Sequence, residues 1–255
     1  MKRTRQKFFV LLLVLLLAGV AVSPGGAGWC AASKVVVVAS TSWAGAIAAA
    51  AGADEVRVLA PLELRHPPEY DYRPSDIARL KEATAFVYAG YEPFANKLLA
   101  ASGFPKSQTF TVLTENVPET LKQQAGMLAA KLGTQAREAE WEIRFNQVTA
   151  VIRSRAEQKK IAQIKVLVQQ HQQPFVKWLG YRIVGVFGAE EMSPAKVLAY
   201  SKLGATLIID NFHNPQGKPI AEISRCQYAD LINFPSPQAP TLIELFQENA
   251  ARLGL

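Results

Sequence analysis

Cysteine is scarce in this sequence, and its scarcity gives no support for a disulfide framework. The chain of 255 residues has two cysteines, Cys30 and Cys226, and most of the sequence separates them. Cys226 falls in a predicted helix over 220–227, where we expect it in the core rather than as a metal ligand. Charge is also modest. Charged residues make up 19% and apolar residues 49%, which argues against extended disorder and allows a sizeable core.

Common nucleotide-binding and catalytic motifs are absent too. The sequence has neither G-x-G-x-x-G nor a Walker loop, so it gives no support for nucleotide binding. It has neither G-x-S-x-G nor H-E-x-x-H, which removes two common hydrolase signatures. The acid pair Glu190-Glu191 is typical of a solvated face. We therefore predict a protein that is not an enzyme.

The net charge gives no indication of nucleic-acid binding. The formal value is +7, but four cations lie in an N-terminal leader that contains no acid: Lys2, Arg3, Arg5 and Lys7. Subtracting these four leaves +3, and no basic stripe interleaved with aromatic residues is present.

The leader has the three parts of an export signal. Residues 1–7 are basic, Phe8–Val22 is a 15-residue apolar run, and small residues follow up to Ala27. The run is shorter than the roughly 20 apolar residues of a membrane span. We expect residues 1–32 to be a leader and the protein to be exported, to the periplasm or the outer face of the cytoplasmic membrane.

Three fates of the leader stay open. Cleavage near Ala27 or Ala32 would release the chain, and an uncleaved apolar run would anchor it. Lipidation of Cys30 would attach a mature N-terminus to the membrane, although Trp29 stands where bacterial lipoprotein signals usually place a small residue. Membrane association through the leader or a lipid anchor is therefore open.

Short β-branched runs alternate with helix-like segments along most of the remaining chain. This alternation predicts an α/β fold with mostly parallel sheets covered by helices. The predicted strands are 34–39, 56–60, 85–89, 109–114, 165–168, 181–187, 206–210 and 229–233. The predicted helices are 41–52, 76–83, 94–101, 174–179, one that starts at Ser193, 219–227 and 240–253.

Residues 118–160 interrupt this alternation. They contain no strand-like run, and their apolar residues recur at roughly helical spacing. They predict a long, rigid linker helix between two lobes, either continuous or broken near Gly133; two ordinary packed helices are the alternative. The predicted domains are the leader (1–32), an N-terminal lobe (33–117), the linker (118–160) and a C-terminal lobe (161–255).

All three histidines, His66, His171 and His213, follow predicted buried strands. Open α/β sheets place their ligands at the carboxyl ends of strands. Imidazole is the commonest protein ligand for zinc and suits several other divalent metals. The three histidines therefore predict one divalent-metal site.

Carboxylates near these histidines would complete the site. Asp210 precedes the His213 loop and would make a tetrahedral set with the three imidazoles. Glu69 shares the proline-stiffened loop of His66 and is the reserve ligand. Three imidazoles favour Zn²⁺, whereas more carboxylate would suit Mn²⁺. An ion held by both lobes would couple binding to domain closure.

Three further sequence features occur together in one protein family. They are a valine-rich first strand followed by Ser40-Thr41, a V-x-V-L-x-P step ending at Pro61, and a Y-x-x-x-P-S-D segment from Tyr70 to Asp76. With these, nearly the whole mature chain resembles the exported solute-binding proteins of bacterial zinc and manganese ABC transporters. The resemblance implies two α/β lobes, a rigid helical linker, a metal ion in the interlobe cleft, and delivery to an ABC permease.

Several positions depart from that family's pattern. Pro68 stands where the family usually has its first histidine, and the nearby His66 is displaced from that position. Glu115–Pro118 lacks the family's second histidine, whereas His171 matches its third ligand position. Asn233–Pro235 lacks the family's last acid, and the acidic histidine-rich loop of many zinc members is absent. His213 has no counterpart in the usual pattern and is placed to compensate.

Three functions therefore stay open, in order of preference. The first is a metal-capturing receptor that delivers its ion to a permease. The second is a receptor of the same fold that has lost metal and binds an organic or oxyanion ligand. The third is an exported metallohydrolase, which would need an open coordination position with a base beside it.

Overall fold

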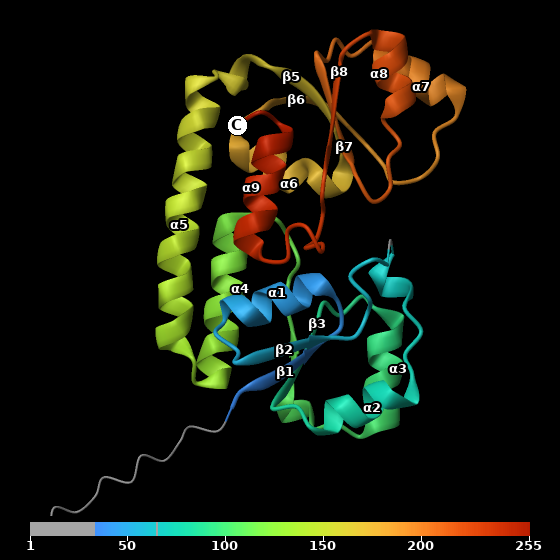
Figure 1. The fold of residues 1–255 in the computed structure, drawn as a ribbon. Coiled ribbons are helices and arrows are strands. Elements are labelled where there is room, and N and C mark those ends of the chain that lie inside the picture. The colour runs from blue at the N-terminus through green and yellow to red at the C-terminus, as the bar shows by residue number, and fades with distance from the viewer. Residues whose placement is uncertain (1–33, 65) are drawn as a thin grey trace, which may run out of the picture. The chain divides into compact units, whose positions relative to one another are not determined.

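Two four-stranded parallel sheets organise the part of the chain that the structure describes (Figure 1). The structure is a computed structural model, and it describes residues 34–64 and 66–255. The predicted leader and Cys30 therefore lie outside the described residues. Among the described residues, no helix combines the length and the apolar character that crossing a membrane requires.

The N-terminal lobe is built on a sheet with the strand order β2-β1-β3-β4. Its strands are β1 (Val36–Ala39), β2 (Glu55–Val58), β3 (Ala85–Tyr88) and β4 (Thr109–Thr111). Side chains alternate between the two faces of a strand. Val37 and Ala39 therefore pack on the side of α1 (Ser42–Ala50), and Val38 packs on the side of α2 (Pro74–Lys81) and α3 (Pro93–Ser102).

The C-terminal lobe repeats this plan with the strand order β6-β5-β7-β8. Its strands are β5 (Lys165–Gln169), β6 (Arg182–Phe187), β7 (Leu207–Asn211) and β8 (Gln227–Leu231). One face carries α7 (Pro194–Ser201) and α8 (Lys218–Ser224), and the other carries α6 (Gln173–Leu179) and α9 (Leu242–Arg252). The short 3-10 turns are η1 (Pro67–Glu69), η2 (Lys106–Gln108), η3 (Ile161–Gln163) and η4 (Gln170–Gln172).

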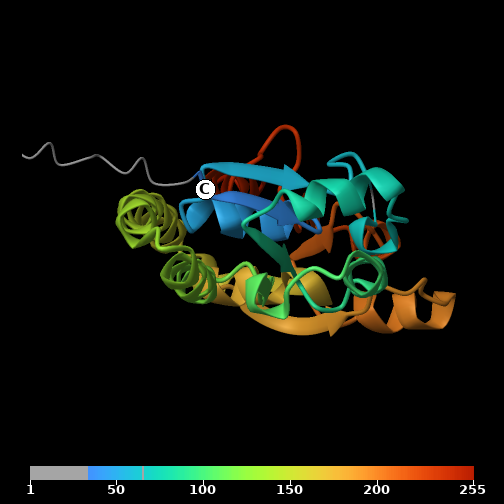
Figure 2. The same cartoon turned by 90° about the horizontal axis from the view of Figure 1, so that it is seen from below.

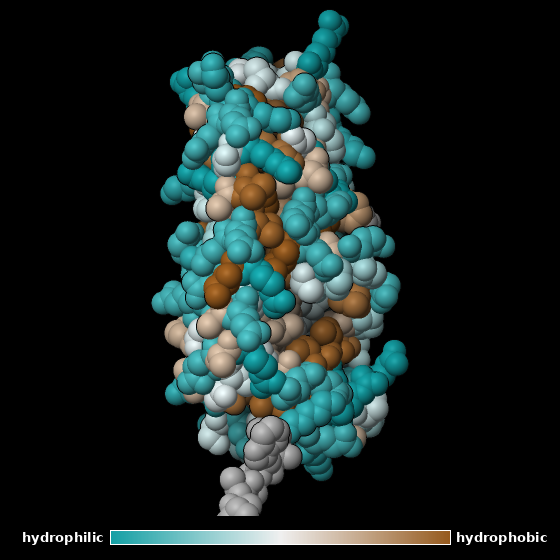
Figure 3. Space-filling view, turned by 60° about the vertical axis from the view of Figure 1, so that its left-hand side comes forward, coloured by the Kyte–Doolittle hydropathy of each residue, from teal (hydrophilic) through white to brown (hydrophobic). Residues whose placement is uncertain are grey.

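The predicted linker is a helical hairpin, α4 (Pro118–Leu132) followed by α5 (Gln135–Gln158). Gly133 ends α4 in the left-handed conformation, with a φ of 73° that a glycine adopts without steric cost. The two helices lie side by side at one edge of the fold in both ribbon views (Figures 1 and 2). With 24 residues, α5 extends about 36 Å and is the element that reaches from one lobe to the other. Seen from this side, the surface is mostly polar with interrupted apolar patches (Figure 3).

Two of the differences from the predicted helix boundaries have a clear local cause. The helix predicted to start at Asp76 starts at Pro74, because the Asp76 carboxylate accepts the backbone N–H of Arg73 at 2.8 Å and closes the first turn. The helix predicted to run to 227 ends at Ser224, because Arg225 adopts a left-handed φ of 54°. Cys226 therefore lies after the helix, half-buried against the apolar cluster beneath α7 and α8.

One apolar core is continuous through both lobes. It joins Trp43 and Ile47 of α1 to α4 and α5, and then to α6, α9 and the strands of the second sheet. Stacked and edge-on rings reinforce it where α5, α6 and α9 meet. Phe246 of α9 lies 5.1 Å from Phe145 of α5 and 5.2 Å from Phe175 of α6, measured between ring centroids. This cluster therefore joins the two lobes, and each lobe has a smaller apolar cluster of its own on the other face of its sheet.

Candidate functional site

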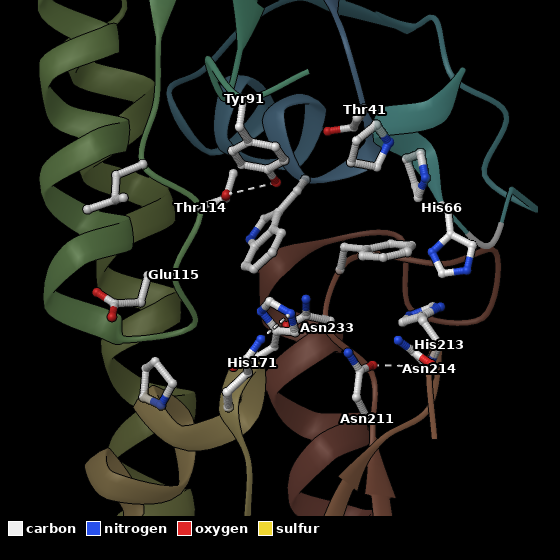
Figure 4. Close-up of a pocket in the computed structure, with 17 residues that line it drawn as sticks. Thr41, His66, Tyr91, Thr114, Glu115, His171, Asn211, His213, Asn214 and Asn233 are labelled. Atoms are coloured by element: carbon white, nitrogen blue, oxygen red, sulfur yellow. Dashed lines mark hydrogen bonds between the residues drawn. The ribbon is translucent and has the colours of Figure 1, made fainter. Parts of the chain in front are cut away.

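A cavity of about 570 Å³ lies between the carboxyl ends of the two sheets. Every strand except β6 is followed by a segment that contributes to its wall, as expected for a ligand site of open parallel sheets. In Figure 4, Thr41, His66 and Tyr91 approach the cavity from the N-terminal lobe, and His171, Asn211, His213 and Asn233 approach it from the C-terminal lobe. The cavity is therefore an interlobe cleft, and all three histidines line it.

His66 stands at the start of the short turn η1, in the loop between β2 and α2. Pro67 and Pro68 occupy the first two positions of this turn, where their fixed φ angles suit the backbone and no N–H is needed. Both prolines also line the cleft. They make this part of the N-terminal wall stiff and hold the exposed His66 side chain at its edge.

His171 is held by the turn that follows β5. The Gln169 side chain accepts the backbone N–H of His171 at 2.7 Å, which fixes the start of η4. The ring is exposed to the open cleft, yet the surrounding walls withdraw it from bulk water, and this burial lowers the pKa of His171. The charge of Glu190 acts in the opposite direction and raises the pKa of His171. The result favours the neutral imidazole, the form that binds metals.

His213 is oriented by aromatic neighbours. Its ring stacks on Phe234, with centroids 3.8 Å apart and planes inclined by 16°, and it meets Phe212 edge-on at 5.3 Å. Its backbone N–H donates to Oδ1 of Asn211 at 3.0 Å. His213 and Phe234 therefore form one flat aromatic surface on the C-terminal wall of the cleft.

The two predicted carboxylate ligands do not line the cleft. Asp210 is fully buried, and its oxygens accept the backbone N–H of Gly217 at 2.6 Å, that of Asn211 at 2.8 Å and the Tyr228 hydroxyl at 3.0 Å. Burial raises the pKa of the Asp210 carboxyl, and these hydrogen bonds lower it. Glu69 is exposed at the end of η1, outside the lining.

Glu115 is the carboxylate that does line the cleft, and the sequence prediction missed it. It lies between β4 and α4, and its Oε2 accepts the Thr120 hydroxyl at 3.3 Å. A signal was present, since Glu115 follows a predicted strand as the histidines do. In the view of Figure 4, His171 lies closer to Glu115 and Asn233, whereas His66 lies above His213.

The imidazoles surround the cavity without converging on one point. Among residues 34–64 and 66–255, no three His, Cys, Asp or Glu side chains are grouped closely enough to hold one ion. Most of the wall is aromatic or amide in character, with Trp43, Tyr91 and Phe234 as aromatic residues and Gln170, Asn211, Asn214 and Asn233 as amides. The cleft therefore combines imidazole side chains with a chamber of small-molecule size.

The fold matches solved structures of a periplasmic metal-binding protein and of a zinc-bound mutant of ZnuA. These matches confirm the two-lobed α/β fold and, at the level of the fold, the resemblance seen in the sequence. No protein-family model matches the sequence, and no curated protein matches it either.

Three of the matching structures belong to two proteins. The manganese-bound periplasmic metal-binding protein from Candidatus Liberibacter asiaticus has a TM-score of 0.64 and 15% identity, covering 86% of this chain and 98% of that chain. Its cadmium-bound form has a TM-score of 0.64 and 16% identity over the same shares. A zinc-bound deletion mutant of ZnuA has a TM-score of 0.64 and 20% identity, covering 86% of this chain and 96% of that chain.

Proposed function

We propose that this protein is an extracytoplasmic solute-binding protein that captures a divalent metal ion in the interlobe cleft and delivers it to an ABC permease. One observation carries the proposal: the three histidines of the chain, from distant parts of the sequence, all line one cavity. The metal-bound neighbours of the same fold support it. The neighbour from Candidatus Liberibacter asiaticus is a periplasmic protein, which supports export of this chain.

The ligands in this proposal are His66, His171 and His213, with Glu115 as the available carboxylate of the lining. Three imidazoles favour Zn²⁺ over Mn²⁺, because manganese prefers more oxygen ligands. Asp210 and Glu69 were predicted for the same role, but their positions give them no part in the set proposed here.

Metal-induced stabilisation of the untagged, metal-stripped protein tests the proposal. Zn²⁺ at a thousandfold excess over its Kd should add about 4 kcal/mol to the free energy of unfolding. For a folded body of this size, that corresponds to a rise in Tm of roughly 8–16 °C.

Glutamine at each histidine provides the matched variants. Glutamine keeps polarity and approximate size but lacks the imidazole nitrogen, so His66→Gln, His171→Gln and His213→Gln should each weaken Zn²⁺ binding at least tenfold, about 1.4 kcal/mol. Glu222→Gln, which changes an exposed acid on α8, should bind like the parent. If all three histidine variants bind Zn²⁺ as tightly as the parent, the histidines are not ligands and the metal site is rejected.

The pH dependence of affinity gives an independent test. Metal-binding imidazoles must be neutral, so Zn²⁺ affinity should fall as the pH drops through about 6.5. Isothermal titration at pH 7.5 and pH 5.5 should show at least tenfold weaker binding at the lower value. Equal affinity at both would argue against imidazole ligands.

A second candidate function is a receptor for an organic molecule without metal. The specific observation in its favour is the size of the cavity, together with the lack of a converged ligand group among the described residues. It differs from the first candidate in one measurable respect, because its ligand should bind equally well to the metal-stripped protein in the presence of EDTA.

A further inference from the structure

The volume of the cleft is much larger than a bare ion needs. The cleft has a volume of about 570 Å³. A zinc ion sits only about 2.0–2.1 Å from each imidazole nitrogen and leaves no chamber of this kind. The cavity instead falls in the range of about 300–1,000 Å³ that is typical of sites for small organic molecules.

The shared core opposes closing this chamber by a hinge. Trp43 at the cleft belongs to the same apolar cluster as Phe145 of α5 and Phe246 of α9. In addition, the Asn116 side chain donates to the backbone oxygen of Asn233 at 2.9 Å, beside the cleft and across the two lobes. A large rotation of one lobe would break this packing, so the cleft keeps room for a species larger than an ion.

The walls also present apolar surface that an ion would leave in water. Tyr91 is 56% exposed and Leu113 is 57% exposed, and both line the cavity. The flat surface formed by His213 and Phe234 lies on the opposite lobe. Aromatic surfaces of this kind bind planar ring systems by stacking and by burial of apolar area.

Two polar atoms of lining residues are buried without a protein partner in the described part of the chain. Nε1 of Trp43 and Oδ1 of Asn233 have no hydrogen-bond partner among the described residues. Trp43 is only 7% exposed, and burying an unsatisfied polar group costs free energy. A metal cation cannot accept the indole N–H, so an ion alone does not satisfy Trp43.

The few charged residues of the lining also favour a chelated ion over a bare one. Among the described residues of the lining, Glu115 is the one carboxylate, and no Lys or Arg is present. A bare divalent ion would keep an uncompensated positive charge in this setting, which is costly away from water. A chelating molecule with its own anionic donor atoms would neutralise the ion before it enters.

We propose that the cleft takes its metal ion as a neutral complex with a small planar chelating molecule. An imidazole of the wall completes the coordination of the ion, and the ring system of the chelator lies against Tyr91 and the His213–Phe234 surface. This inference rests on the proposed metal-binding function and names the chemical class of its cargo.

Calorimetry with two matched probes tests it on the metal-stripped protein. The first probe is the one-to-one complex of Zn²⁺ with 8-hydroxyquinoline-5-sulfonate, which is planar, aromatic and neutral overall. The second is the one-to-one complex of Zn²⁺ with iminodiacetate, which is also neutral but has no ring. The aromatic complex should bind at least tenfold more tightly than both the iminodiacetate complex and Zn²⁺ alone.

Tyr91→Leu separates ring stacking from metal binding. Tyr91 is an exposed side chain, so this variant should fold. It should lose most of the advantage of the aromatic complex while keeping the affinity for Zn²⁺ alone. Phe234→Leu should behave similarly toward the aromatic complex and serves as the second variant.

The remaining outcomes distinguish the two proposals. If Zn²⁺ alone binds tightly and the aromatic chelator only strips it from the protein, the chelate inference fails and the metal receptor stands. If neither Zn²⁺ nor either complex binds, the metal-receptor function itself fails. If the chelator binds equally well without metal, the metal part of the inference is rejected in favour of an organic ligand.

Discussion

Asp210 and His213 are three residues apart, and their surroundings give them different roles. His213 lines the cleft, whereas Asp210 is buried beneath it and holds the turn that leads into α8. Gly217 completes this arrangement. A Cβ at Gly217 would come within 2.7 Å of the Ile208 side chain and 3.1 Å of Oδ2 of Asp210. The carboxylate is therefore a structural acceptor for a close-packed turn.

Asp210→Asn should destabilise the protein without weakening metal binding. The amide replaces one charged acceptor oxygen by a donor, so hydrogen bonds from Gly217 and Tyr228 are weakened or lost. The free energy of unfolding should fall by about 2 kcal/mol, measured by urea denaturation. Zn²⁺ affinity should stay within a few-fold of the parent. Lost affinity with unchanged stability would instead return Asp210 to the ligand set.

The residue scale also shows what the sequence could predict of the site. The three histidines that follow predicted strands, His66, His171 and His213, line one cavity, and their role as ligands stays a prediction. The rule that ligand groups follow parallel strands, applied to carboxylates, selected Asp210, because a sequence pattern does not reveal that an acid will be buried and fully hydrogen-bonded. The sequence analysis did not select Glu115 or Tyr91, because their proximity to the cleft depends on how the two lobes face each other.

At the scale of the element, the helical hairpin carries an unusual buried acid. Glu138 of α5 is 8% exposed, and its Oε1 has no hydrogen-bond partner among the described residues. It lies against Gly126 of α4, where an added Cβ would approach Oε1 at 4.0 Å. Burial raises the pKa of Glu138, and the charge of Glu142 raises it further.

Glu138→Gln should therefore stabilise the protein in a pH-dependent way. The folded state holds the Glu138 proton more tightly than the unfolded state, so rising pH removes stability in the parent. The variant lacks this penalty and should gain roughly 1 kcal/mol at pH 7.5, or about 2–4 °C in Tm. The gain should shrink toward pH 4, where both states of the parent are protonated. A gain that does not depend on pH would show that the carboxylate charge is not its cause.

The helical hairpin shows which properties of a helix can be predicted from the sequence. Apolar spacing identified helix throughout 118–160, and Gly133 marked the break. Whether the chain continued straight or folded back depended on packing between α4 and α5, which no local signal encodes. The end of α8 was misplaced for a similar reason, since a left-handed arginine at position 225 is not predicted by its residue type.

At the scale of the molecule, alternating strands and helices were sufficient to predict two parallel sheets. The strand order is the same in both sheets. In each, the first strand of the lobe is an inner strand that lies between the second and third strands of that lobe. The sequence separated the two lobes, and the structure joins them through one interior. Residues such as Phe246, which connect the lobes, have the same apolar character as residues within either one, so the sequence does not distinguish them.

The shared interior has a consequence for how the protein melts. Two lobes with independent cores would unfold in two steps, and a ligand in the cleft would shift them unequally. Here the core passes through both, so residues 34–255 should unfold as one cooperative unit, with equal calorimetric and van't Hoff enthalpies. Occupation of the cleft should then raise one transition as a whole and slow amide hydrogen exchange in α5 as strongly as in the loops that touch the ligand. Two resolved transitions in scanning calorimetry would mean that each lobe can lose its structure alone.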